Sequence, residues 1–260
     1  MTRWFLGLGL LLLCLQAASA PRAAPPIRLH LAGDSTLADK LPEKRPETGW
    51  GEPFAMLFAA GSVRVINHAR NGRSTRTFIE EGRWQALLDD AVPGDHVFLQ
   101  FGHNDASEHK ADRYTPLPQY RENLRRFVLE ARAAGLHPLL LTPVARRRFD
   151  AAGELQSSHG AYPQAVRALA EELAVPLVDA EALSSALLIK AGPGASRHLF
   201  LHLLPGEHPN HPQGLQDDTH FSPAGAMAVA AAIAGALRAQ THPLAVWLAA
   251  HTAARTEAAR

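Results

Sequence analysis

Short apolar runs alternate with helical patterns along this chain, and this alternation limits the possible folds more than any other feature of the sequence. The runs are rich in Val, Leu, Ile and Phe, and they are Ile27–Leu31, Val63–Asn67, His96–Phe101, His137–Leu141 and Val175–Val178. The segments expected to form helices are Glu52–Ala60, Thr75–Ala91, Pro118–Ala134, Tyr162–Ala174 and Pro223–Ala239. Apolar runs of this length are typical of strands buried on both faces.

The repeated order of strand, helix and strand predicts a parallel sheet that is covered by helices on both faces. We therefore expect an α/β protein: a three-layer α/β/α sandwich around a five-stranded parallel sheet, similar to flavodoxin. Ligands bind such sheets at the carboxyl ends of the strands. Functional residues should therefore follow the apolar runs rather than precede them.

Turn and cap residues agree with these boundaries. Glycines that favour a helix end stand near the ends of three expected helices, at Gly61, Gly94 and Gly135. Ser222 and Pro223 suit the first positions of the last helix. The segment Ala191–Asp217 is rich in Gly, Pro and His without a clear period. We expect it to be a long loop, and long ordered loops are often functional.

The N-terminal residues 1–20 have the pattern of a secretory signal peptide. Arg3 supplies a positive charge, Trp4–Leu15 is a short apolar core, and Ala18-Ser19-Ala20 fits a cleavage site. The alternative is an uncleaved anchor. We expect residues 21–26 to form a flexible lead-in, 27–241 a single domain, and 242–260 an Ala-rich tail that is partly helical and frays. A cleaved leader places the protein in the periplasm or outside the cell.

Cysteine count and charge narrow the function classes. Cleavage after Ala20 would remove Cys14, the only cysteine, so the mature chain would contain neither a disulfide nor a thiol. The leader holds one Arg and no acid, which leaves 25 basic and 25 acidic side chains in the rest of the chain. A net charge near zero argues against nucleic acid or an anionic membrane as the main partner of the mature form. We expect a monomer.

Small and polar residues gather where the architecture predicts a site. They follow the first three apolar runs and precede the last helix, at Gly33–Ser35, Asn67–Ser74, Gly102–Asp105 and Asp217–Pro223. Acyl transfer by a serine needs a hydroxyl on a tight turn, a base, an acid that orients the base, and donors for the oxyanion. These segments contain all four kinds of group.

The roles can be assigned from residue type and spacing. Ser35 can supply the hydroxyl, with Gly33 permitting a sharp turn and a following helix start lending its N–H groups. His220 can act as base, and Asp217, three residues earlier, can orient it. Each also has an ordinary structural alternative, with Ser35 as a helix cap and His220 as a loop residue.

The oxyanion donors expected from the sequence come from three different strand ends. They are the backbone N–H groups of Ser35 and Gly72 and the side-chain NH₂ of Asn104. Gly72 is also compatible with a purely conformational role, and Asn104 with a simple turn. Asp34 is interpreted as a structural turn acid.

The motifs of this chain resemble those of a known superfamily. Four blocks match the SGNH (GDSL) hydrolases in order and spacing, namely Gly33-Asp34-Ser35, Gly72, Gly102-x-Asn104-Asp105 and Asp217-x-x-His220. Within it the chain is similar to rhamnogalacturonan acetylesterases, in the stretches AGDSTLA, GWGEPF, NHARNGRSTRTF, QFGHND, LTPVARRRF and DDTHFSPAGA. The resemblance implies an α/β/α fold and a Ser–Asp–His triad of Ser35, Asp217 and His220. It also implies oxyanion donors at Gly72 and Asn104, no metal, and removal of acetyl esters from plant polysaccharide. The neighbouring Asp218 could substitute for Asp217.

Four further residues are candidates for substrate contact: Trp50, Arg73, His103 and Arg146. Trp50 would stack on a sugar, although a core or surface position before a helix is the alternative. Arg146 opens a run of three arginines and would contact the carboxylate of galacturonate. The alternative for that run is a solvated basic surface.

We expect neither a metal nor a cofactor. The histidines of the long segment have irregular spacings of 4, 6 and 3, and these are His198, His202, His208 and His211. The function expected is a secreted carbohydrate acetylesterase acting on an acetylated polysaccharide or oligosaccharide. The alternatives are a GDSL lipase or arylesterase, a polysaccharide O-acetyltransferase, and a non-catalytic sugar-binding protein.

Overall fold

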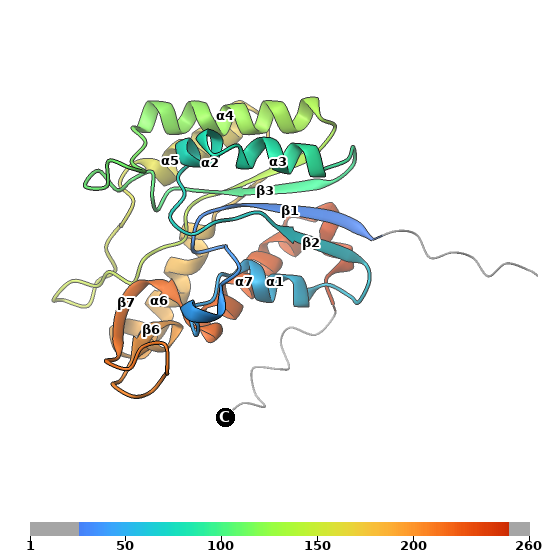
Figure 1. The fold of residues 1–260 in the computed structure, drawn as a ribbon. Helices are drawn as coiled ribbons and strands as arrows, with labels where there is room; N and C mark the ends of the chain where they lie inside the picture. The colour runs from blue at the N-terminus through green and yellow to red at the C-terminus, as the bar shows by residue number, and fades with distance from the viewer. Residues whose placement is uncertain (1–25, 250–260) are drawn as a thin grey trace, which may run out of the picture.

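In the computed structural model, which describes residues 26–249, five parallel strands form the central sheet (Figure 1). The strands are β1 Ile27–Gly33, β2 Val63–Asn67, β3 His96–Gln100, β4 His137–Leu141 and β5 Leu177–Val178, in the order β2-β1-β3-β4-β5. This confirms the predicted α/β class and the five-stranded parallel sheet. The signal peptide, its cleavage site and most of the lead-in lie outside the described residues, as does the end of the tail.

Helices cover both faces of the sheet, as the alternation predicted (Figure 1). One face carries α2 Thr75–Glu80, α3 Arg83–Asp90, α4 Leu117–Ala133 and α5 Tyr162–Glu172. The other face carries α1 Gly51–Phe54, α6 Ala180–Ala195 and α7 Pro223–Ala239. Alternate residues of each strand enter the two cores: Phe98 packs in the core with α1 and α7, and its neighbour Leu99 packs in the core with α4.

Two predicted helices are shorter than expected. The pattern over Thr75–Ala91 is broken into α2 and α3 because Gly82 takes a left-handed conformation, with φ of 68°. The pattern over Glu52–Ala60 yields the short α1 and a 3₁₀ turn at Ala55–Leu57. Gly61, Gly94 and Gly135 all have positive φ, but only Gly135 directly follows a helix, next to the C-cap Ala134 of α4. Gly61 and Gly94 lie in turns beyond the ends of the preceding helices. Ser222 caps α7 by accepting a hydrogen bond from Gly225 N at 3.1 Å.

The prediction of a loop over Ala191–Asp217 was wrong. This segment completes α6, forms a 3₁₀ turn at Ser196–Leu199, and then builds an antiparallel hairpin of β6 Phe200–Leu203 and β7 Leu215–Phe221. Phe200 and Phe221 are buried against each other, with ring centroids 5.2 Å apart, and this contact anchors the hairpin to the core. A two-stranded sheet with one short buried end leaves little alternation in the sequence to detect.

The core also continues past residue 241. A 3₁₀ turn at Pro243–Trp247 follows α7, and Leu244 within the turn and Leu248 directly after it are buried. The segment from 242 to 249 therefore belongs to the folded domain rather than to a fraying helix. No helix within residues 26–249 is long and apolar enough to cross a membrane.

Candidate active site

A cavity of about 570 Å³ opens at the carboxyl edge of the parallel sheet. Its lining comes from the segments that follow four strands: Ser35 after β1, Gly72 after β2, Asn104 after β3 and Arg146 after β4. His220 of β7 also lines it. The polar residues that sequence analysis placed at the strand ends therefore meet in one place.

Ser35, His220 and Asp217 form a continuous chain of hydrogen bonds. His220 Nδ1 donates to Asp217 Oδ2 at 2.7 Å, which leaves Nε2 to accept from Ser35 Oγ at 3.0 Å. The histidine is therefore held in the tautomer that can take a proton from the serine hydroxyl. This arrangement fits nucleophile, base and orienting acid.

An irregularity in the β6–β7 hairpin creates the Asp217–His220 contact. Leu201 pairs with Asp217, and the adjacent Phe200 pairs with Phe221. The three residues between Asp217 and Phe221 therefore have no pairing partner on β6 and form a bulge. Within this bulge, Asp217 Oδ1 accepts from Thr219 N at 2.7 Å and from His220 N at 3.0 Å. The carboxylate is thus fixed by three donors from its own loop.

Electrostatics keep Asp217 ionised. Burial alone would raise the pKa of this carboxyl, but the hydrogen bonds from His220 and Thr219 and the charge of His220 lower it to about 2. The neighbouring Asp218 points elsewhere, pairing with Arg147 Nη1 at 2.8 Å and His202 Nε2 at 2.7 Å. Of the two carboxylates, only Asp217 contacts His220.

The serine sits on a tight turn, and the helix start expected after it does not form. Leu37 N and Ala38 N donate to the Asp34 carbonyl, and the chain then continues without a helix to a 3₁₀ turn at Pro42–Lys44. Asp34 holds the turn, since its Oδ1 accepts from Thr36 N at 2.9 Å and Thr36 Oγ1 at 2.8 Å. Gly33 must remain glycine, because a Cβ there would lie 2.5 Å from the Gln100 carbonyl oxygen.

The candidate oxyanion donors line the same cavity as Ser35. Asn104 is 8% exposed and donates through Nδ2 to the Arg73 carbonyl at 2.9 Å, which leaves its second N–H for another acceptor. Gly72 lines the same cavity with φ of 78°, a conformation that L side chains rarely adopt. Both residues line the cavity that Ser35 lines, so their N–H groups are candidates to bind the carbonyl oxygen of an attacked ester.

Two charged residues of the site were missed by sequence analysis. Lys40 is buried; its Nζ donates to the Ser35 carbonyl and pairs with Glu47 Oε1 at 2.7 Å. That Glu47 oxygen lies 3.9 Å from His220 Nε2. Neither residue belongs to a motif, and single charges between an apolar run and a helix usually indicate an exposed loop.

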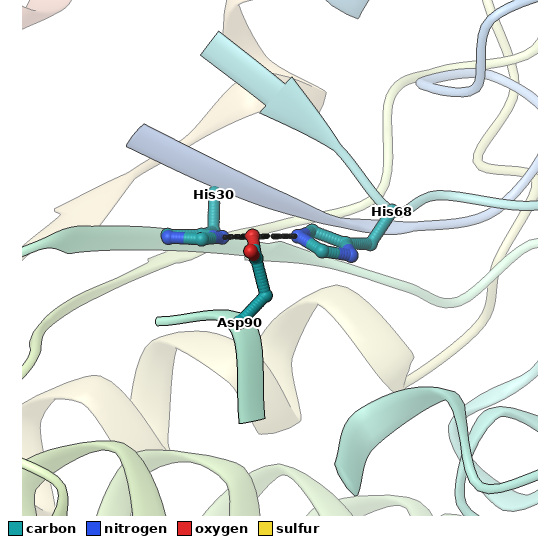
Figure 2. A group of neighbouring side chains, drawn as sticks. All are labelled: His30, His68 and Asp90. Carbon is teal, nitrogen blue, oxygen red and sulfur yellow. Dashed lines mark hydrogen bonds and ion pairs between the residues drawn. The ribbon is translucent and has the colours of Figure 1, made fainter. Parts of the chain in front are cut away.

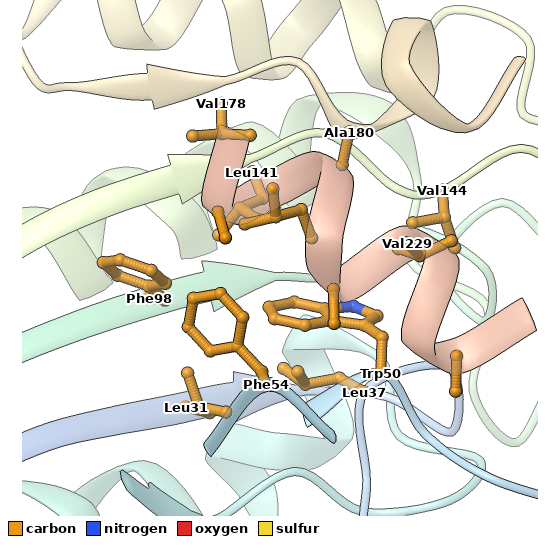
Figure 3. Packing of buried hydrophobic residues seen from close by; sticks show 14 of the residues in the cluster. Leu31, Leu37, Trp50, Phe54, Phe98, Leu141, Val144, Val178, Ala180 and Val229 are labelled. Carbon is orange, nitrogen blue, oxygen red and sulfur yellow. The ribbon is translucent and has the colours of Figure 1, made fainter. Parts of the chain in front are cut away.

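Trp50 was wrongly predicted to contact the substrate. Its side chain is 0% exposed and packs beneath the sheet with Phe54 and Phe98 (Figure 3). Its Nε1 donates to Gln100 Oε1, and Gln100 Nε2 in turn donates to Thr36 Oγ1 at 2.8 Å. The indole therefore supports the serine turn from the core instead of stacking on a ligand.

The other three candidates line the cavity. Arg73 pairs with Glu81 at 2.9 Å. His103 is buried; burial lowers its pKa, although Asp34 Oδ2, 3.6 Å from Nδ1, opposes this. Arg146 donates to Thr219 Oγ1 at 2.8 Å and to the His103 carbonyl at 3.3 Å. Both acceptors are uncharged, so Arg146 has no carboxylate at hydrogen-bond distance among the described residues.

The four histidines of the predicted loop do not converge on one point. His202 bonds to Asp218, while the Nδ1 of His198 contacts the Ala195 carbonyl. His208 and His211 face each other across a turn, with ring centroids 6.2 Å apart.

Comparison with known proteins identifies the family of this chain. The model of the GDSL-like lipase/acylhydrolase family matches residues 31–228. Rhamnogalacturonan acetylesterase RhgT of Bacillus subtilis is 44% identical over 219 residues, which cover 84% of this chain and 93% of RhgT. The probable rhamnogalacturonan acetylesterase YesY of the same organism is 36% identical and is covered to 94%.

Solved structures show the same fold. The structure of YxiM from B. subtilis superimposes with a TM-score of 0.71 at 27% identity, covering 84% of this chain and 57% of YxiM. Axe2, an acetylxylan esterase from Geobacillus stearothermophilus, gives a TM-score of 0.57 at 21% identity, covering 86% of this chain and 97% of Axe2.

Proposed function

The chain belongs to the GDSL-like lipase/acylhydrolase family and is a carbohydrate esterase, and from this premise we propose that it removes acetyl groups from rhamnogalacturonan. The observation that carries the proposal is the chain of hydrogen bonds from Ser35 through His220 to Asp217, at the wall of a polar cavity of about 570 Å³. A cavity of this size accommodates a few sugar units.

In the proposed mechanism, Ser35 Oγ attacks the acetyl carbonyl carbon while His220 Nε2 accepts the hydroxyl proton. Asp217 stabilises the resulting imidazolium. The Ser35 and Gly72 N–H groups and the Asn104 amide bind the oxyanion of the tetrahedral intermediate. When that intermediate collapses, His220 returns the proton to the departing sugar oxygen, and an acetyl-enzyme remains.

The second half of the reaction releases acetate. A water molecule attacks the acetyl-enzyme while His220 again acts as base. The new tetrahedral intermediate then expels Ser35 Oγ, which recovers its proton from His220. The enzyme returns to its starting state, and acetic acid leaves as acetate.

The lining of the cavity favours an acidic carbohydrate over a lipid. Every lining residue is polar, charged or glycine, which leaves no apolar wall for a long acyl chain. Several cations also line it, including Lys44, Lys110 and Arg146. A guanidinium that is not neutralised by a carboxylate suits the carboxylate of a galacturonate residue near the scissile ester.

We further propose export from the cytoplasm, supported by the signal-peptide pattern of residues 1–20. The full-length chain should appear in the periplasm or the medium, shortened at its N-terminus. A chain that begins at residue 21 should stay in the cytoplasm. Equal export of both forms would contradict this.

The decisive experiment measures acetate release from acetylated rhamnogalacturonan, acetylated xylan and p-nitrophenyl esters of increasing acyl length, with Ser35→Ala as control. We expect rhamnogalacturonan to be preferred, and the variant to lose several orders of magnitude in rate. Preference for long acyl esters would indicate a lipase. Acetyl transfer to an added sugar would indicate a transferase, and absence of labelling by a serine-reactive phosphonate would indicate a binding protein.

A further inference from the structure

A second group of chemically capable side chains lies on the α3 side of the sheet, outside the cavity described above. His30 belongs to β1, His68 follows β2, and Asp90 ends α3. Figure 2 shows the two imidazoles facing each other and the Asp90 carboxylate directed at the gap between them. Within residues 26–249, these three offer ligand atoms that all lie within 4.8 Å of one another.

The spacing of these atoms matches a metal site. His30 Nδ1 lies 2.9 Å from His68 Nε2 and 3.8 Å from Asp90 Oδ2, and His68 Nε2 lies 4.0 Å from the same oxygen. A point equidistant from three atoms so arranged lies about 2.1 Å from each, which is the bond length of zinc to histidine nitrogen and carboxylate oxygen. Little movement is needed to seat an ion.

The surroundings prepare His30 as a ligand. Its Nε2 lies 3.0 Å from Asp95 Oδ2, an oxygen also fixed by the Val92 N–H at 2.9 Å. Nε2 therefore carries the ring proton and donates it to the carboxylate, which leaves the lone pair of Nδ1 directed at His68. Histidines that bind metals regularly donate their other N–H to a carboxylate in this way.

His68 and Asp90 leave a path to solvent. The His68 side chain is 19% exposed and that of Asp90 is 48% exposed, whereas His30 is fully buried. Solvent is also the natural source of a fourth ligand.

We propose that His30 Nδ1, His68 Nε2 and the Asp90 carboxylate bind one divalent transition-metal ion of the zinc class, completed by water. Two imidazoles and one carboxylate suit such ions better than Mg²⁺ or Ca²⁺, which prefer oxygen ligands. The ion takes the place of the proton that the two rings now share, and His68 then carries its proton on Nδ1. Because the ligands come from three segments, the ion ties the edge strand β2 and helix α3 to β1 and stabilises the fold.

Arg28 is the competitor of this ion. Its Nη2 donates to Asp90 Oδ2 at 2.8 Å and to the Asp90 carbonyl at 2.9 Å. The positive guanidinium therefore occupies one side of the ligand oxygen and opposes a second cation. Arg28→Gln keeps a donor while removing the charge, so it should bind the ion more tightly than the parent chain. Weaker binding by this variant would contradict the shared use of Asp90 Oδ2.

The test is isothermal titration calorimetry of the untagged full chain with Zn²⁺ after treatment with a chelator. We expect one ion per chain, with a rise in the thermal unfolding temperature. His68→Gln, Asp90→Asn and Asp95→Asn should each weaken binding by about tenfold or more. The matched control is the double variant His208→Gln/His211→Gln, which should bind as the parent chain does.

A second readout separates loss of a ligand from loss of the fold. Co²⁺ in place of Zn²⁺ should give the strong visible absorption of a four-coordinate site, and this should vanish in His68→Gln while far-ultraviolet circular dichroism stays unchanged. Absence of binding by the parent chain would overturn the proposal. So would undiminished binding by His68→Gln and Asp90→Asn, or loss of binding in the control alone.

Discussion

Lys40 lies directly behind Ser35: its buried ammonium donates a hydrogen bond to the main-chain oxygen of Ser35. The same Nζ donates to Asn71 Oδ1 at 2.8 Å and pairs with Glu47 Oε1 at 2.7 Å. One cation thus joins the serine turn to the loop that carries Gly72. Although Lys40 touches no substrate, it fixes the relative position of the proposed nucleophile and one oxyanion donor.

Lys40→Met should lower both stability and turnover. It leaves the Glu47 carboxylate buried without its partner, which costs about 3 kcal/mol in the free energy of unfolding. The double variant Lys40→Met/Glu47→Leu should recover most of this stability, because the unpaired charge is gone. Its kcat on p-nitrophenyl acetate should nevertheless stay reduced by tenfold or more, because the hydrogen bond from Lys40 no longer holds the turn that carries Ser35.

Chemical denaturation and steady-state kinetics check this prediction, with Lys190→Met, an exposed lysine, as the control. Recovery of kcat together with stability in the double variant would assign Lys40 a purely structural role.

Asp217 and Asp218 are adjacent carboxylates with different partners, so they form a matched pair. Asp217→Asn should reduce kcat by about 10³- to 10⁴-fold, because the amide favours the wrong tautomer of His220. Asp218→Asn loses surface pairs with Arg147 and His202, each worth about 1 kcal/mol or less. It should retain near-normal kcat on p-nitrophenyl acetate. Similar losses in both variants would contradict the assignment of Asp217.

The parallel sheet and the residues brought together at its carboxyl edge could be predicted from the sequence. Buried strands such as His137–Leu141 carry a dense apolar signal, and Ser35, Asn104 and His220 follow from what acyl transfer requires. The β6–β7 hairpin could not be predicted. Its buried residues are few and lie at one end, around the contact between Phe200 and Phe221, and its Gly, Pro and His content is typical of loops.

The other features that the sequence did not predict involve residues that are far apart in the chain and adjacent in the fold. Nothing in the sequence near Trp50 indicates that its indole meets Gln100 fifty residues later. His30 and His68 come together only because β1 and β2 pair in parallel. Such contacts arise from strand order and register, which a local pattern does not encode.

Asn104→Ala should lower kcat much more than it changes KM. An oxyanion donor binds charge that appears only in the transition state, and its loss costs about 10²- to 10³-fold in kcat. The measurement is a comparison of kcat and KM on p-nitrophenyl acetate. A rise in KM with unchanged kcat would assign Asn104 to ground-state binding instead.

Arg146→Gln should distinguish charged from neutral substrates. Loss of a charge-assisted bond to a uronate carboxylate raises KM on acetylated rhamnogalacturonan by about tenfold or more. Hydrolysis of p-nitrophenyl acetate, which has no carboxylate, should change far less. The control is Arg148→Gln, an exposed arginine outside the cavity that contains Ser35. Equal effects on both substrates would show that Arg146 acts through the position of Thr219.

Asp105 should make the free energy of unfolding fall as the pH rises, which is the reverse of the usual effect of a carboxyl group. Its carboxyl is fully buried, with Oδ1 accepting from Thr75 N at 2.9 Å and Thr75 Oγ1 at 2.6 Å. Burial raises the pKa of Asp105 to about 7, although the bonds from Thr75 oppose this. Between its ordinary pKa of 3.8 and about 7, the folded state therefore holds a proton that the unfolded state has released.

Stability from this group is complete below the unfolded pKa and is lost as the pH rises through the folded pKa. Asp105→Asn does not ionise, so it isolates the effect from other groups that the two proteins share. Relative to this variant, the parent chain should lose about 2 to 3 kcal/mol of unfolding free energy between pH 5 and pH 8. Urea denaturation at both pH values measures the difference. A constant gap between the two proteins would mean that Asp105 is ionised throughout, held by Thr75 despite its burial.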